Sequence, residues 1–146
     1  MGGDHARPLN ARGQGDAAAL GAWMQATGLA PQRVLCSSAT RTQQTLAALA
    51  MAAPVEVTDT LYLASAGDML ARIQATPDEI TDLMLIGHNP GIHGLLALLV
   101  GEYAHEADVD RLILKFPTSA TAVLTVKAAH WVDVMPQCAR LETLRY

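Results

Sequence analysis

Short continuous hydrophobic runs alternate along the chain with segments whose apolar residues recur every three or four positions. The apolar runs Val34–Cys36 and Leu83–Ile86 predict two short strands, and Leu83–Ile86, which has no polar alternation, has the pattern of a buried parallel sheet. The short β-branched segment Val55–Thr58 predicts a third strand. Thr121–Val126 predicts a further strand, and the weak alternation of Arg140–Arg145 predicts an edge strand. Because these strands alternate with helical segments, the pattern predicts a three-layer α/β/α sandwich with a mostly parallel sheet.

Capping and stop signals place the helices between these strands. The predicted helices are one that ends at Gly28, one over Ala39–Ala53 capped by Ser37 or Ser38, one capped by Ser65, and one that follows Asn89 and Pro90 and stops at Gly101. The charged stretch Glu102–Arg111 has no clear periodicity and is predicted to be a loop.

His88 directly follows the predicted strand Leu83–Ile86. Asn89 is a capping residue and Pro90 suits the first helical position, so His88 lies beside the free N–H groups of a helix start. This combination favours an anion site that contains an imidazole, and a hydrogen-bonded structural histidine is the alternative.

Arg41 falls in the first turn of the second predicted helix, where the helix dipole disfavours a cation unless an anion is close. A guanidinium offers rigid paired donors for phosphate oxygens, so Arg41 is a candidate phosphate ligand, with a solvated surface arginine as the alternative. Arg41 and His88 each follow the end of a predicted strand, and together they suit phosphoryl chemistry.

Composition narrows the functional classes. The 146 residues are 51% hydrophobic, which suits one domain over residues 1–146, and no apolar run reaches the roughly 20 residues of a membrane span. The net charge of −4, without a Lys/Arg cluster, argues against nucleic acid or an anionic membrane as partner. Two cysteines without metal-ligand spacing and the lack of a signal-peptide pattern favour the cytoplasm, and no metal or other cofactor is expected.

Five segments, in this order, resemble the histidine phosphatase superfamily, also called the phosphoglycerate-mutase-like fold. Within it, Asp4–Gly13, Leu61–Ala64 and Phe116–Ala120 are similar to the short phosphohistidine phosphatases of the SixA type, and the match runs nearly end to end. The segments are Asp4–Gly13, Ser37–Thr45, Leu61–Ala64, Gly87–Pro90 and Phe116–Ala120.

The resemblance implies metal-free hydrolysis of a phosphoryl group through a covalent phosphohistidine. The implied substrate is a phosphorylated histidine of a partner protein or a small phosphoester. By the same resemblance, Arg41 binds the phosphate and His88 holds the transferring phosphoryl group, so these two are the expected catalytic residues. Arg7 and Asn89 join them as substrate-binding candidates, and pairing with an acidic neighbour is the alternative for Arg7.

The sequence departs from the family at the nucleophile, which in the family is the histidine of an Arg-His motif that ends the first strand. No Arg-His pair occurs in the 146 residues, and His5 is the nearest replacement in sequence, although no strand precedes it. The resemblance puts the missing strand beside the one that ends at His88. Either the neighbouring strands pair with each other, or the chain is a fragment of a longer protein, which the intact remaining motifs favour.

Two functions therefore stay open. The first is a phosphohistidine phosphatase. The chain with this sequence is inactive if it lacks the nucleophilic histidine. The second is a non-catalytic phosphate- or phosphoprotein-binding module, in which Arg41, His88 and two helix starts hold an anion without taking up its phosphoryl group.

Overall fold

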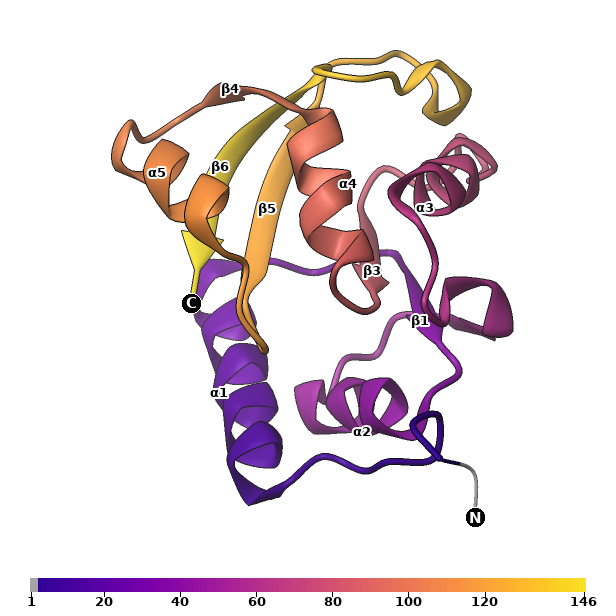
Figure 1. The fold of residues 1–146 in the computed structure, drawn as a ribbon. Coiled ribbons are helices and arrows are strands. Elements are labelled where there is room, and N and C mark those ends of the chain that lie inside the picture. Colours follow the sequence, from indigo (N-terminus) through magenta and orange to yellow (C-terminus); the bar gives the residue numbers. More distant parts are fainter. Residues whose placement is uncertain (1–2) are drawn as a thin grey trace. The chain divides into compact units, whose positions relative to one another are not determined.

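The computed structural model describes residues 3–146 and confirms a mixed α/β fold with a parallel sheet (Figure 1). The chain divides into two compact units. The first contains the described residues up to Leu63 together with Glu79–His88, and the second contains Ala64–Asp78 and Asn89–Tyr146. The single domain expected over residues 1–146 stays a prediction. No helix in the described part of the chain is long and apolar enough to cross a membrane.

The first unit holds a parallel sheet and the two helices that pack with it. Its elements are α1 (Ala11–Thr27), β1 (Arg33–Ser37), α2 (Thr40–Leu49), β2 (Val55–Thr58), the short 3-10 helix η1 (Asp59–Leu61) and β3 (Leu83–Ile86). The strand order is β2-β1-β3, so β1 lies in the middle, and Cys36 is in register with both Val57 and Ile86. The carboxyl ends of the three strands therefore meet at one edge of the sheet.

The three strands of this sheet were predicted correctly, because each is a short apolar or β-branched run in the sequence. The second helix is shorter than the predicted Ala39–Ala53: it ends at Leu49 because Ala50 takes a left-handed conformation with a φ of 55°. The serine cap predicted for this helix is wrong, since Ala39 occupies that position and no side chain caps it. Among the described residues β3 pairs with β1 alone, so its other edge has no strand partner.

Helix α1 fixes the position of α2 through a close backbone contact, and the two helices lie side by side in Figure 1. Asn10 caps α1 by accepting a hydrogen bond from the N–H of Gly13, and Gly28 ends it with a φ of 73°. A Cβ at Gly21 would lie 2.6 Å from the carbonyl oxygen of Leu49, so only glycine permits this approach.

The core of the first unit lies between these helices and the sheet. Its buried residues are Leu20, Met24, Val34, Cys36, Leu49 and Ile86. The thiol of Cys36 is fully buried in the middle strand, and burial raises its pKa to about 11. Cys36 is thus a core residue of the first unit.

The second unit combines three helices with a mixed sheet. Its elements are α3 (Ala66–Gln74), α4 (Gly91–Leu99), β4 (Val100–Tyr103), α5 (Ala107–Leu114), β5 (Thr121–Val126), the 3-10 helix η2 (Trp131–Asp133) and β6 (Ala139–Arg145). In this sheet β4 runs parallel to β6, and β5 runs antiparallel to it. Ser65 caps α3 as predicted, by accepting a hydrogen bond from the N–H of Asp68.

Three predictions for this unit are wrong. The predicted loop Glu102–Arg111 contains the end of β4 and part of α5, a helix of 8 residues that is too short to show a clear period. Gly101 does not stop a helix but lies within β4, where a Cβ would meet the carbonyl oxygen of Gln137 at 2.3 Å. The predicted edge strand, β6, is the middle strand and is paired on both sides.

The contact at Gly21 leads to a stability prediction. Gly21→Ala is expected to lower the free energy of unfolding by about 1–3 kcal/mol, because the added methyl group forces α1 away from the backbone of Leu49. Gly15→Ala in the same helix is the matched control. Its Cβ meets nothing within 4 Å, so the gain in helix propensity leaves stability equal to or above that of the wild type. Urea unfolding of the three proteins measures both effects, and equal midpoints would contradict the close packing of α1 on α2.

Candidate functional site

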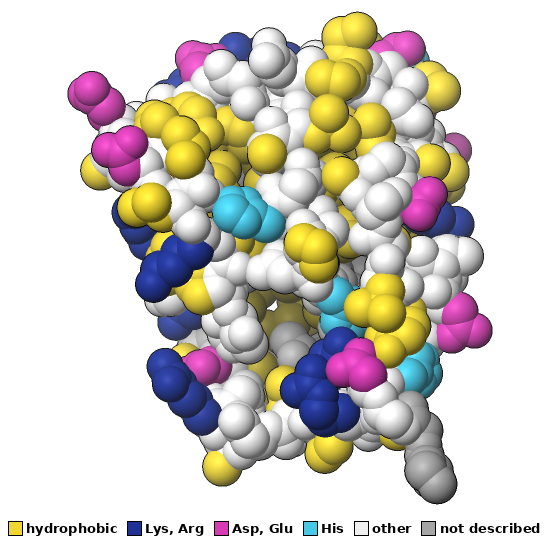
Figure 2. All heavy atoms as spheres, viewed as in Figure 1, with side chains coloured by type: hydrophobic (Ala, Val, Ile, Leu, Met, Phe, Trp, Pro, Cys, Tyr) yellow, Lys and Arg dark blue, Asp and Glu magenta, His cyan; other side chains and the backbone are white. Residues whose placement is uncertain are grey.

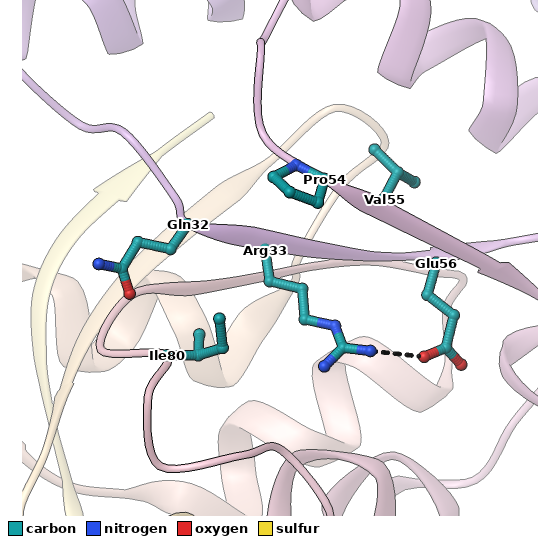
Figure 3. Close-up of a pocket in the computed structure, with 6 residues that line it drawn as sticks. All are labelled: Gln32, Arg33, Pro54, Val55, Glu56 and Ile80. Atoms are coloured by element: carbon teal, nitrogen blue, oxygen red, sulfur yellow. Dashed lines mark hydrogen bonds and ion pairs between the residues drawn. The ribbon is translucent and has the colours of Figure 1, made fainter.

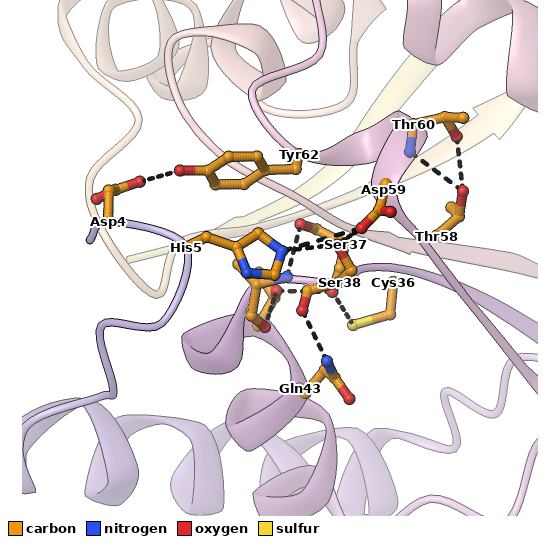
Figure 4. A network of polar contacts seen from close by, with 12 residues as sticks. Asp4, His5, Cys36, Ser37, Ser38, Gln43, Thr58, Asp59, Thr60 and Tyr62 are labelled. Carbon is orange, nitrogen blue, oxygen red and sulfur yellow. Dashed lines mark hydrogen bonds and ion pairs between the residues drawn. The ribbon is translucent and has the colours of Figure 1, made fainter. Parts of the chain in front are cut away.

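A polar cluster lies at the carboxyl edge of the parallel sheet in the first unit. It gathers side chains from the N-terminal turn, the end of β1, the first turn of α2, the segment after β2 and the end of β3. Figure 4 shows part of this cluster, with the side chain of Asp4 directed at the hydroxyl of Tyr62 and that of His5 directed at Ser38 and Asp59. Figure 2 shows basic, acidic and histidine side chains next to one another in the lower right of the face drawn.

His88 is held between a cation and a hydroxyl group. Its side chain is nearly buried, its Nδ1 lies 3.1 Å from Nη2 of Arg41, and its Nε2 lies 2.8 Å from the hydroxyl oxygen of Ser37. A guanidinium can only donate, so Nδ1 must accept and Nε2 carries the proton that is donated to Ser37. Burial, followed by the charge of Arg41, lowers the pKa of His88 below the usual 6.5, so the imidazole is neutral at neutral pH.

Arg41 lies in the first turn of α2, as predicted, and the anion that its position requires is Asp4. The side chain of Arg41 is only 15% exposed. Its Nη1 donates to the backbone carbonyl of Asp4 at 2.7 Å, and its Nη2 donates to Oδ2 of the same residue at 3.1 Å. Arg41 therefore bridges a carboxylate and the imidazole of His88.

The Asp4 carboxylate collects donors from three segments of the chain. Oδ2 accepts from the hydroxyl of Tyr62 at 2.7 Å as well as from Arg41, and Oδ1 accepts from Nη2 of Arg7 at 3.2 Å. The hydrogen bond from Tyr62, followed by the contacts with Arg7 and Arg41, lowers the pKa of Asp4 to about 2. The same hydrogen bond raises the pKa of Tyr62. Pairing with an acidic neighbour, one of the two alternatives for Arg7, is thus observed.

His5 belongs to a second group of contacts beside this carboxylate. Its Nε2 lies 2.9 Å from the hydroxyl of Ser38, which in turn donates to a carboxylate oxygen of Asp59. The ring of Tyr62 stands edge-on to His5, with 4.8 Å between ring centroids, and edge-on to His88 at 5.5 Å. The backbone carbonyl of His5 accepts from the N–H of Thr40 at 2.9 Å, which ties the N-terminal turn to the start of α2.

Asn89 is engaged elsewhere, within the second unit. Its side-chain amide donates to the carbonyl of Phe116, and its Oδ1 accepts from the N–H of His93 at 3.1 Å, in the first turn of α4. Asn89 therefore accepts a hydrogen bond from the first turn as predicted, but α4 begins one residue later than predicted, at Gly91, and Pro90 rather than Asn89 occupies the cap position. A substrate-binding role for Asn89 stays a prediction. In the first unit, Arg7 and Arg41 both contact Asp4, and His88 contacts Arg41.

A cavity of about 240 Å³ lies at the opposite end of the parallel sheet (Figure 3). It is lined by residues at and before the amino ends of β1 and β2 and by Ile80, and it contains the ion pair between Arg33 and Glu56 at 3.1 Å. No histidine or nucleophilic side chain lines it, so the polar cluster is the stronger candidate for chemistry. The part of the chain from residue 3 to residue 146 contains no cluster of three or more His, Cys, Asp or Glu side chains that could hold a metal ion.

Comparison with known proteins identifies the family. The model of the histidine phosphatase superfamily (branch 1) matches residues 1–81, which is more than half of the chain. The chain belongs to the histidine phosphatase superfamily. The segments that carry Arg7 and Arg41 lie within the matched region of this histidine phosphatase chain, and the segment that carries His88 lies beyond it.

Related proteins and structures agree with this assignment. An uncharacterised protein of Mycobacterium tuberculosis is 42% identical over 139 residues, which cover 94% of this chain and 87% of that protein. The structure of a candidate phosphohistidine phosphatase SixA from Nakamurella multipartitia has a TM-score of 0.87 and 32% identity, covering 98% of this chain and 86% of the other. A similar candidate from Agrobacterium tumefaciens has a TM-score of 0.80 and 28% identity, with 98% and 85% covered. The predicted fold class and SixA-type resemblance are therefore confirmed.

Sequence reasoning missed several members of the cluster in this histidine phosphatase. Ser37 was expected only as a possible helix cap, and Asp4 and Tyr62 lay in segments that resembled the family without being assigned a role. Charge balance was the available signal for Asp4, because the position of Arg41 called for an anion nearby. No sequence signal pairs Ser37 with His88, since the two are 51 positions apart.

The environment of His88 leads to a titration prediction. In ¹⁵N-labelled protein, His88 is expected to show the neutral Nε2–H form at neutral pH and to titrate below 6.5. Arg41→Gln removes the neighbouring charge and raises the pKa of His88, whereas Arg12→Gln, on the exposed side of α1, leaves it unchanged. Imidazole ¹H–¹⁵N correlation spectra measure both, and a proton on Nδ1 would contradict the assignment.

The lowered pKa of His88 also determines how the stability of the folded chain changes with pH. The unfolded chain binds a proton at His88 at a higher pH than the folded chain does, so this contribution to stability is complete above pH 6.5. It is lost progressively as the pH falls below 6.5 toward the folded-state pKa of His88.

Proposed function

We propose that this histidine phosphatase binds a phosphoryl group between Arg41 and His88 and removes it from a phosphorylated histidine of a partner protein. The observation that carries the proposal is the direct contact between Arg41 and His88 at the carboxyl edge of the parallel sheet. Family membership and the likeness to candidate SixA phosphatases support the choice of substrate class. A small phosphoester is the alternative substrate, and action in the cytoplasm stays a prediction.

The proposed reaction uses the cluster to stabilise charge. The guanidinium groups of Arg41 and Arg7 donate to the equatorial phosphoryl oxygens, and His88 holds the transferring group from the side of Arg41. An attacking imidazole nitrogen forms a bond to phosphorus while the bond to the substrate's imidazole breaks and that leaving nitrogen takes up a proton. Water then hydrolyses the phosphohistidine intermediate and releases inorganic phosphate.

The attacking imidazole is assigned to an Arg-His motif on a strand beside β3. The edge of β3 that has no strand partner among the described residues supports this assignment. The second candidate is a non-catalytic phosphate- or phosphoprotein-binding module. It is favoured by one specific observation, namely that the sequence contains no Arg-His pair.

The anion site is tested by ligand binding. Arg41→Ala is expected to weaken the binding of inorganic phosphate or vanadate by about 10- to 100-fold, because a charge-assisted pair of donors is lost. Arg33→Ala is the matched control, since Arg33 lies at the opposite end of β1 and pairs with Glu56. Isothermal titration calorimetry measures the affinities. An unchanged affinity in Arg41→Ala would remove Arg41 from the site.

Turnover of a phosphohistidine peptide separates the two candidate functions. The chain is assayed as it stands and with the in-frame upstream sequence added, and activity only in the longer form would identify the nucleophile as upstream. His88→Ala in the active form is expected to abolish turnover with an unchanged circular dichroism spectrum. His130→Ala, which alters a surface pair with Asp78, is expected to retain it. Phosphate binding without turnover in either form would favour the binding module.

A further inference from the structure

The side chain of Asp4 occupies the position in the cluster where donors for an oxyanion converge. Its two carboxylate oxygens accept from Arg7, Arg41 and Tyr62, which come from the N-terminal turn, from α2 and from the segment after η1. Two guanidinium groups and a hydroxyl directed at one point are a donor set suited to a tetrahedral oxyanion such as phosphate. Here the same donors are bound to a carboxylate of the protein.

A carboxylate and a phosphoryl group cannot use these donors at the same time. The Nη2 of Arg41 and the Nη2 of Arg7 each already contact an oxygen of Asp4, at 3.1 Å and 3.2 Å. Two adjacent anions would also repel each other in a site where Arg41 is only 15% exposed. Binding of an external oxyanion at Arg41 therefore requires that the carboxylate of Asp4 leaves.

The structure leaves room for that movement without unfolding the N-terminal turn. The side chain of Asp4 is 48% exposed, so rotation about its Cα–Cβ bond can carry the carboxylate into solvent. The backbone carbonyl of Asp4 has its own hydrogen bond from Nη1 of Arg41, at 2.7 Å. This bond does not depend on the side-chain rotamer, so the turn stays attached to α2 while Nη2 of Arg41 is released.

We propose that the Asp4 carboxylate is an internal competitor, which fills the oxyanion site of the unliganded protein and rotates out when a phosphoryl group binds. The proposal rests on the proposed function, because it takes Arg41 and Arg7 as phosphoryl ligands. It adds that the affinity for a phosphoryl ligand is reduced by the fraction of molecules in which Asp4 occupies the site. A ligand must therefore displace a tethered anion as well as bind.

The test is the affinity of Asp4→Asn for inorganic phosphate, measured by isothermal titration calorimetry beside the wild type. The neutral amide no longer competes, and an affinity about 10-fold higher is expected if the carboxylate occupies the site in about 90% of molecules. Asp59→Asn is the matched control. It removes one negative charge from the same polar cluster without altering a contact to either arginine, so it measures the effect of net charge alone.

A second measurement uses the unaltered protein. Inorganic phosphate is expected to shift the side-chain carboxyl ¹³C resonance of Asp4, because three donors are released, and to leave that of Asp59 nearly unchanged. A gain in phosphate affinity for Asp4→Asn that is no larger than the gain for Asp59→Asn would overturn the proposal that Asp4 competes with the ligand. So would an unshifted Asp4 resonance in protein saturated with phosphate. The proposed function would remain intact in either case. A lack of phosphate binding by both the wild type and Asp4→Asn would overturn the competitor and the anion site together.

Discussion

The candidate site depends on the compensation of one poorly exposed positive charge. Arg41 lies in the first turn of α2, where the helix dipole opposes a cation, and its side chain is only 15% exposed. Asp4 supplies the negative charge, and the N-terminal turn is fixed against α2 by the bonds from Arg41 and by the bond between His5 and Thr40. Without a carboxylate or another anion, this arrangement would contain an uncompensated charge.

The same guanidinium determines the state of His88. Because Nη2 of Arg41 faces Nδ1, the imidazole must be neutral with its proton on Nε2, and the buried hydroxyl of Ser37 accepts that proton's hydrogen bond. One side chain thus orients both the acidic and the imidazole partner of the site. The parallel sheet makes it possible for one side chain to contact both partners, because strand ends that are far apart in sequence are adjacent in space.

Local patterns predicted the strands of the first unit well, since β1 and β3 are apolar runs and β2 is a β-branched segment, and each can be recognised without knowledge of its neighbours. The second unit was harder to predict. Weak alternation in β6 suggested an edge strand, but its position in the sheet depends on pairing with both β4 and β5, which sequence periodicity does not encode. Helix α5 was missed because its 8 residues span barely two turns and bury little beyond Asp108 and Leu112.

The site was predicted in part, for a comparable reason. Arg41 and His88 could be predicted because each follows the end of a strand and has a local sequence signal. Arg41 is a cation in the first turn of a helix, and His88 lies beside the free N–H groups of a helix start. Their partners do not stand out: Asp4 is 37 positions from Arg41, and Ser37 is 51 positions from His88. Contacts over such distances depend on the register of the sheet and on the docking of the N-terminal turn, which only the folded structure supplies.

Each unit of the fold contains one free, buried cysteine: Cys36 in the middle strand of the parallel sheet and Cys138 just before β6. A buried thiol, and above all one with the raised pKa of Cys36, reacts with alkylating reagents only when the surrounding structure opens. Each of the two thiols therefore reports on the opening of its own unit. Their rates of modification, resolved by peptide mass spectrometry, would report how often each unit opens and whether an oxyanion slows the opening of the unit that binds it.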